Sequence, residues 1–193
     1  MEPFGEVLFS RRGWVRNVIS NSTLLTATDL VVTRKARLMI GSIVEYHDLI
    51  GNYLGKGMNG GEVGMDKSVV FDENKNVLLC MQKVVGLPRF PYGTTGLFDS
   101  AGNRVAELSG IGRGKWKIVL WRWERDGEVI LRTENSKSRF WEFFDKNSSS
   151  VATIQIKFKS MLLDHVKQQV SISPNADRLP VLGMIQLLAQ MTV

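Results

Sequence analysis

The sequence predicts a mainly β protein, a closed antiparallel β-barrel of about 12 strands around a hydrophobic helix at the C-terminus. Short apolar strands recur along the chain, and polar turns rich in Asp, Asn and Gly separate them. Four such turns follow an aromatic residue and an acid, and these units open at Phe71, Phe98, Trp123 and Phe144. Because the spacing of the four units is irregular, a closed barrel of successive hairpins is favoured over a solenoid or a propeller.

The chain begins with a segment of mixed character, and residues 1–28 are predicted to form an N-terminal extension. The barrel is predicted to occupy residues 29–193 as a single domain. The start lacks the basic opening and apolar run of a signal peptide, and Cys80 is the only cysteine. We therefore expect an intracellular protein of the cytoplasm, membrane-associated or nuclear, and not a secreted one. Cys80 lies in an apolar run, which favours a buried hydrophobic side chain over a reactive thiol.

The first strand is predicted at residues 28–38, and the next segment is the least regular of the chain. Residues 41–67 contain Gly51, Gly55, Gly57, Gly60, Gly61 and Gly64 among others. Because glycine weakens both helices and strands, this segment is predicted to be a glycine-rich insertion, a long surface loop. A short helical or strand piece is expected near residues 43–53.

From residue 68 onward, strands follow one another closely. They are predicted at residues 69–71, 77–84, 96–98, 105–108, 116–123, 129–133, 139–144, 151–159 and 165–172. The last one alternates clearly, with Val166, Gln168 and Val170 on one face and Lys167 and Gln169 on the other.

The chain ends in a run from Leu179 to Val193 that is apolar on almost every side. Such a helix lies inside a protein or inside a membrane. Its length of ~22 Å falls short of a ~30 Å hydrocarbon core, so burial inside the barrel is favoured. Gln186 and Gln190 are expected near a barrel mouth or hydrogen-bonded to strand backbone.

The residues that catalysis or metal binding would need are sparse. Two histidines and one cysteine are too few for a typical zinc site. The glycine-rich stretch 110–115 leads into a predicted strand, whereas a phosphate-binding loop must lead into a helix. The turns that begin at Asp72 and Asp145 lack the Gly and Glu of a calcium-binding loop. No enzyme activity, metal or cofactor is therefore expected.

The order of these motifs resembles that of the LURP-one-related family of plants. This family belongs to the tubby C-terminal-like superfamily, which also includes the phospholipid scramblases. The segments that carry the resemblance are residues 30–35, 71–79, 97–103, 114–118, 151–157 and 170–177, followed by the apolar helix. The resemblance spans roughly residues 29–190 and implies a barrel around a central hydrophobic helix. The glycine-rich segment 41–67 and a shorter third turn depart from the family pattern.

The resemblance implies a non-enzymatic binding module with a link to plant defence and an analogy to membrane-tethered transcription regulators. Tubby domains bind phosphoinositides through basic side chains on the barrel wall, and this chain carries 25 Lys and Arg against 19 Asp and Glu. The candidates for a lipid-headgroup site are Lys83, Arg89, Lys115, Lys117 and Arg122. A solvated strand face is the competing interpretation of each one.

The expected partner is an anionic phospholipid or another protein. A nucleic-acid-binding barrel with a basic and aromatic face is the alternative, but the chain lacks a basic tail and the aromatic motifs of an RNA-recognition sheet. A small-ligand barrel is disfavoured because the helix would fill its lumen. We expect a monomer without a transmembrane segment.

Overall fold

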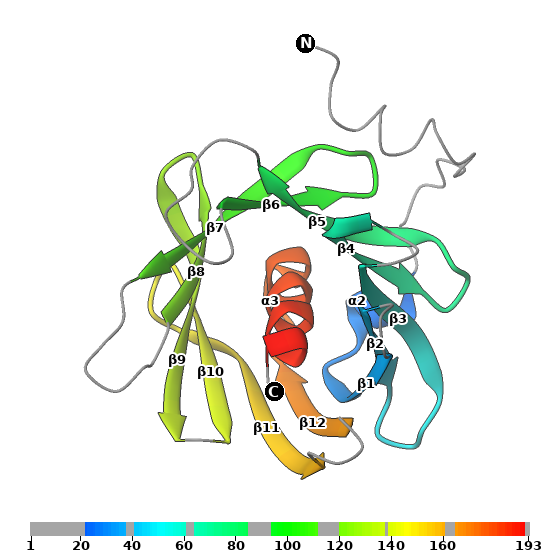
Figure 1. Ribbon diagram of the computed structural model, residues 1–193. Coiled ribbons are helices and arrows are strands. Elements are labelled where there is room, and N and C mark those ends of the chain that lie inside the picture. Colours follow the sequence, from blue (N-terminus) through cyan, green and yellow to red (C-terminus); the bar gives the residue numbers. More distant parts are fainter. Residues whose placement is uncertain are drawn as a thin grey trace.

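The computed structural model describes residues 22–37, 41–60, 64–84, 94–111, 120–137, 139–160 and 165–191. They form a closed barrel of antiparallel strands with helix α3 (Arg178–Met191) in its centre (Figure 1). The barrel closes because the first strand pairs with the second on one side and with the last on the other. The predicted fold class is confirmed.

Each strand pairs with its neighbours in the sequence, as in a series of hairpins. The strands are β1 (Asp29–Arg37), β2 (Gly41–His47), β3 (Tyr53–Gly60), β4 (Gly64–Asp72), β5 (Val77–Val84), β6 (Thr94–Asp99), β7 (Arg104–Ile111), β8 (Leu120–Arg125), β9 (Glu128–Lys137), β10 (Phe140–Asp145), β11 (Ser150–Ser160) and β12 (His165–Ile172). The predicted strand 116–123 corresponds to β8 only in its second half, because residues 112–119 lie outside the described part.

The prediction of a long loop at residues 41–67 is wrong. This segment forms β2, β3 and the first residues of β4, which pair in register as two further hairpins. The glycines of β3 are explained by close packing and do not mark a loop. A Cβ atom on Gly57 would overlap the side-chain amide of Gln186, and a Cβ atom on Gly55 would overlap the carbonyl oxygen of Phe71. Glycine therefore lets β3 approach both the central helix and β4.

Helix α3 fills the lumen with apolar side chains. Val181, Leu182, Met184 and Ile185 are fully buried and belong to the main core cluster. Their partners come from the inward positions of the strands, which alternate with outward positions along each strand. The composition argument for a buried helix is thus confirmed.

One glutamine of this helix lies deep in the lumen rather than at a mouth. The exposed fraction of Gln186 is 0%. Its Oε1 accepts a hydrogen bond of 2.7 Å from the Tyr46 hydroxyl, and its Nε2 donates one of 3.2 Å to Oγ of Ser68. The expected bond to strand backbone is replaced by two bonds to strand side chains, which satisfy the buried amide. The side chain of Gln190 lies outside the described part.

The end of the predicted N-terminal extension belongs to the packed structure. The one-turn helix α2 (Thr23–Thr26) places Leu24 in the main core cluster with no exposed surface. Nη1 of Arg178 donates a 2.7 Å hydrogen bond to the carbonyl oxygen of Ala27, which joins this segment to the start of α3. The boundary at residue 28 therefore falls inside a packed segment.

Candidate functional site

The barrel has two chemically different ends. Five tight turns connect β2–β3, β4–β5, β6–β7, β8–β9 and β10–β11, and because the strands are antiparallel these turns share one end. We call it the turn end. At the opposite end, the far end, the connections fall at residues 38–40, 61–63, 85–93, 112–119, 138–139 and 161–164, nearly all of which lie outside the described part.

Four of the five turns share one hydrogen-bonded design. In each, the first Asp accepts bonds at Oδ1 from the backbone N–H groups two and four residues later. The fourth residue has a positive φ. These turns begin at Asp48, Asp72, Asp99 and Asp145. The turn after Trp123 differs, since it is a two-residue loop with positive φ at Asp126 and Gly127, typical of a type I′ hairpin.

The turn carboxylates are acceptors for their own loops, which explains the superficial likeness to calcium loops. At Asp48, desolvation acts to raise the pKa, but hydrogen bonds from Asn52, Ile50 and Gly51 outweigh it and hold the pKa below the ordinary value. Within the described ranges, no group of three or more His, Cys, Asp or Glu side chains is placed to hold a metal ion.

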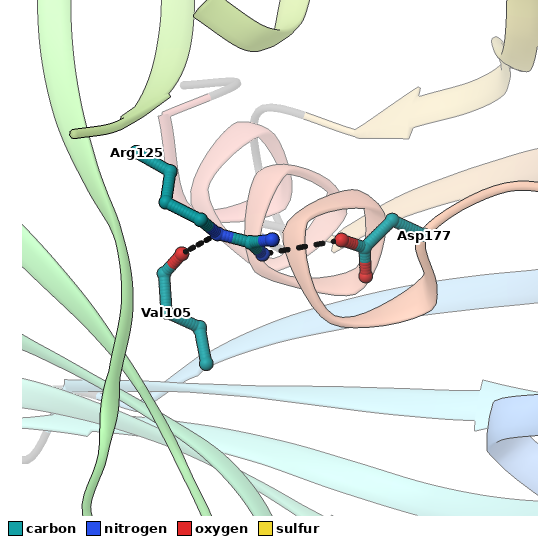
Figure 2. A network of polar contacts seen from close by, with 3 residues as sticks. All are labelled: Val105, Arg125 and Asp177. Carbon is teal, nitrogen blue, oxygen red and sulfur yellow. Dashed lines mark hydrogen bonds and ion pairs between the residues drawn. The ribbon is translucent and has the colours of Figure 1, made fainter. Parts of the chain in front are cut away.

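The turn end also fixes the entry of the helix into the barrel. Nε of Arg125 donates a 2.8 Å hydrogen bond to the carbonyl oxygen of Val105, and its Nη2 lies 3.3 Å from Oδ2 of Asp177 (Figure 2). Asp177 directly precedes α3, where a negative charge is favourable beside the helix N-terminus. One guanidinium therefore joins β7, β8 and the start of α3.

The charges divide between the two ends. Cations within four residues of the far end of their strands are Arg34, Lys35, Arg37, Lys67, Lys83, Arg122, Lys137, Lys157, Lys159 and Lys167. Acids in the same positions are Asp66, Glu134 and Glu142. Acids in the turns or near the turn end include Asp29, Asp48, Asp72, Glu73, Asp99, Asp126, Glu128, Asp145 and Asp177. Cations at the turn end include Lys75, Arg104, Arg125, Lys146 and Arg178. Among the described residues, cations therefore clearly outnumber acids at the far end, whereas the turn end carries both signs with more acids than cations, which gives the barrel an electrostatic direction.

Lysines on three adjacent strands form the best-described part of the basic surface. Lys35 on β1, Lys167 on β12 and Lys157 on β11 are exposed. Lys167 lies opposite Thr33 on one side and Phe158 on the other. The Lys35 ammonium is 3.3 Å from a carboxylate oxygen of Glu45, so its charge is partly neutralised. Alternation along this strand predicts that Lys167 lies on the face opposite Val166 and Val170, but Lys167 is not among the predicted headgroup residues.

The lumen becomes polar toward the same far end. Arg34, Ser42 and Gln168 are buried, with exposed fractions of 6%, 6% and 2%. They occupy inward positions, because each lies two residues from a core residue of its own strand and so on the same face, as Arg34 does from Val32 and Ser42 from Val44. Helix α3 runs toward this end, and a cation is favourable near a helix C-terminus. The alternation of Leu30, Val32 and Arg34 could have shown from sequence that this arginine points inward.

The structure describes two of the five predicted headgroup residues. Lys83 is the second-last residue of β5 and lies opposite Thr95. Arg122 is on β8, where its Nε lies 2.5 Å from Oε1 of Glu124. Strands β6 and β7 separate these two residues, so they do not form one cluster. Arg89, Lys115 and Lys117 lie outside the described part, in connections that join strand ends at the far end.

Cys80 matches the interpretation as a buried hydrophobic residue. Its exposed fraction is 1%, and burial raises its pKa to about 12, with a smaller opposing effect of Lys67. The thiol is therefore protonated at neutral pH, and the thiolate is the nucleophilic form. The buried position and the raised pKa leave this side chain a packing role.

Among the described residues, no helix combines the length and the apolar composition needed to cross a membrane.

No protein-family model and no curated protein matches the chain. Its structure is similar to an X-ray structure of the protein AT5G01750 from Arabidopsis thaliana, with a TM-score of 0.61 at 13% sequence identity. The superposition covers 91% of this chain and 99% of the Arabidopsis chain. At this identity the similarity establishes the shared barrel fold.

Proposed function

We propose that this protein is a non-enzymatic binding module of the LURP-one-related type whose far end binds anionic phospholipid headgroups. The family assignment is supported by the order of the hairpin motifs, by the central helix, and by the fold shared with the Arabidopsis protein over nearly its full length. The single observation that supports the ligand class is the separation of charge between the ends of the barrel.

The direction of the charge matters more than the net value. A net charge of +6 spread evenly would attract many anions weakly. Here exposed lysines such as Lys157 and Lys167 occupy the far end, while turn-end acids such as Asp99 and Asp145 would repel an anionic surface. A barrel with this polarity approaches a negatively charged membrane with its far end first. Each lysine close to such a surface contributes roughly 1 kcal/mol of attraction.

Sedimentation with vesicles tests the proposal. Vesicles of phosphatidylcholine alone are compared with vesicles that also contain a phosphatidylinositol phosphate, at low salt. We expect binding to the phosphoinositide vesicles, with an affinity that falls as salt is raised. The Lys157→Glu/Lys167→Glu variant is expected to bind at least tenfold more weakly.

The matched control places the same charge change at the other end. Lys75 and Lys146 are exposed residues of two turns, and Lys75→Glu/Lys146→Glu changes the net charge equally. We expect this variant to keep most of the binding. Equal losses in the two variants, or no preference for phosphoinositide over neutral lipid, would exclude the proposed site. Binding of a single-stranded oligonucleotide without vesicle binding would favour the nucleic-acid alternative.

A further inference from the structure

The β2–β3 turn carries an exposed apolar tip at the turn end of the barrel. The exposed fractions are 57% for Leu49, 86% for Ile50 and 44% for Tyr53. Among the residues that the structure describes, no other large hydrophobic side chain is comparably exposed. Single exposed apolar residues are common on protein surfaces, but here all three lie in one turn and its first strand residue. We call Leu49, Ile50 and Tyr53 the apolar tip.

The backbone of the turn does not require apolar side chains at these positions. Leu49 and Ile50 are the second and third residues of a turn whose hydrogen-bonded design recurs in three other turns. The same two positions hold Glu73 and Asn74, Ser100 and Ala101, and Lys146 and Asn147. Because polar or small residues serve in the same geometry, folding alone does not account for leucine and isoleucine here.

Hydrogen bonds fix the backbone that presents the tip. Oδ1 of Asp48 accepts bonds of 3.0 and 2.8 Å from the N–H groups of Ile50 and Asn52, and its Oδ2 accepts one of 2.7 Å from Nδ2 of Asn52. Below the turn, His47 and Tyr53 pair across the two strands, and their rings meet edge to face with centroids 5.8 Å apart. A group that is ordered before binding loses little conformational entropy when a partner covers it. The tip is therefore suited to anchor a partner.

Carboxylates surround the apolar tip. The pKa of Asp48 lies below its ordinary value, so this group is ionised at neutral pH. Glu45 lies two residues before His47 and hence on the same outward face of β2. Burial raises the pKa of the Tyr53 hydroxyl, and the negative charges of Glu45 and Asp72 add to this rise. Both carboxylates are thus close enough to act on a residue of the tip.

The nearby cations do not cancel this charge. The Lys35 ammonium lies 3.3 Å from a carboxylate oxygen of Glu45 and neutralises part of it. Lys75 belongs to the neighbouring β4–β5 turn, which also carries Glu73. The tip therefore keeps an excess of negative charge around an apolar centre.

This chemistry selects among the possible occupants. An anionic membrane would repel the carboxylates, and so would the same tip of a second copy. An apolar pocket bordered by lysine and arginine side chains complements both the centre and the border of the tip. We propose that the apolar tip docks into such a pocket on a partner protein. Docking at the turn end leaves the far end free, so the same barrel can hold this protein and a lipid surface at once.

Site-specific photo-cross-linking of the full chain tests the docking. The photoreactive residue p-benzoyl-phenylalanine replaces Ile50 in one protein and Asn147, the third residue of the β10–β11 turn, in the control. Each protein is irradiated in an extract of the cells in which it occurs, and the cross-linked residue of any captured protein is mapped by mass spectrometry. We expect an adduct from position 50 alone, mapped to apolar residues bordered by lysine or arginine. Failure to find an adduct specific to position 50 would overturn the proposal. So would an adduct with a second copy of the chain, or with a surface that lacks bordering cations.

Binding of the purified partner measures the contribution of the tip. Leu49→Ser/Ile50→Ser should weaken binding at least tenfold while far-UV circular dichroism stays unchanged, because a few apolar anchors dominate such interfaces. The affinity of the unaltered protein should also fall as salt is raised. Asn74→Ser/Asn147→Ser is the control, since it changes the third residue of two other turns and should bind normally. An unchanged affinity in the tip variant would overturn the proposal.

Vesicle sedimentation separates this docking from the proposed lipid site. Leu49→Ser/Ile50→Ser should bind phosphatidylcholine vesicles that contain a phosphatidylinositol phosphate as well as the unaltered protein does, because the tip and the basic surface lie at opposite ends. A loss of vesicle binding in this variant would place the tip in the membrane and overturn its docking on a protein.

Discussion

At the scale of single residues, the buried amide of Gln186 contacts β2, β3 and β4, the part of the barrel wall that was predicted to be a loop. The amide bonds Tyr46 on β2 and Ser68 on β4, and it occupies the space left by the missing side chain of Gly57 on β3. Burial also raises the pKa of Tyr46, so this hydroxyl stays a hydrogen-bond donor at any ordinary pH. Three adjacent strands are therefore set around one polar group of the helix.

Gly57→Ala should destabilise the protein by about 2–4 kcal/mol, because the new methyl group displaces the amide and breaks its two hydrogen bonds. Chemical denaturation of the variant measures this loss. The Gln186→Ala variant removes the obstacle, so the double variant Gly57→Ala/Gln186→Ala should be more stable than the sum of the single effects predicts. Strict additivity would contradict this account of Gly57.

The acid dependence of stability should report the Asp48 turn. Its folded pKa is lowered, so the ionised carboxylate stabilises the fold above the unfolded pKa, and this contribution is lost as the pH falls through the folded pKa. Asp48→Asn lacks the ionised group. We expect the difference in Tm between the two proteins to be largest near neutral pH and to shrink as the pH is lowered. A difference that is constant from pH 7 to about pH 3 would contradict this.

At the scale of elements, α3 offers a matched pair of substitutions. Ile185 is fully buried in the lumen, whereas Leu187, two residues later, is only partly buried. Ile185→Asp should abolish the cooperative thermal transition, because an unpaired charge would enter the core at a cost above about 4 kcal/mol. Leu187→Asp should destabilise less and leave a lowered but measurable transition. A larger effect at Leu187 would contradict the orientation of the helix.

The strands that the sequence predicted correctly are those with alternating or apolar patterns and Asp turns. The short helical or strand piece expected near residues 43–53 overlaps β2 only in part, and β3 was missed because Gly55 and Gly57 break the pattern that marks a strand. Glycine there reflects contact with Gln186 and with the backbone of β4, and both partners are distant in sequence. The β2–β3 turn has the same hydrogen bonds to Oδ1 of its first residue, Asp48. Its sequence did not resemble the other turns because Leu49 and Ile50 are apolar.

The sequence predicted the basic character of the candidate site but not which of its residues lie side by side. Alternation along β12 marked Lys167 as outward, but its neighbours on β11 and β1 follow from the closure of the barrel. The selected Lys83 and Arg122 both lie toward the far end, yet two strands separate them. Sequence patterns show which way a side chain points along one strand. They do not show which strands become neighbours around a closed barrel.

At the scale of the whole molecule, the closing pair of strands joins the two ends of the described chain. Asp29 lies opposite Ser171, so the pairing of β1 with β12 joins segments that are far apart in the sequence. Such long-range pairing makes folding slow, in the range of roughly milliseconds to seconds for barrels of high contact order. Refolding followed by continuous-flow and stopped-flow mixing together should therefore show no major phase on the microsecond scale, and the stopped-flow traces should lack a large missing amplitude. A dominant microsecond phase that restores native fluorescence would contradict this.

The position of α3 in the sequence has a consequence for synthesis in the cell. The helix that fills the lumen follows the last strand, so the ribosome releases it after every wall strand has emerged. Until then, inward side chains such as Val44, Leu97 and Phe143 have no central partner. A nascent chain with so many exposed apolar strands attracts chaperones and is prone to aggregate. Termination before Arg178, which would remove all of α3, would therefore leave an open, unfilled sheet rather than a slightly shorter barrel.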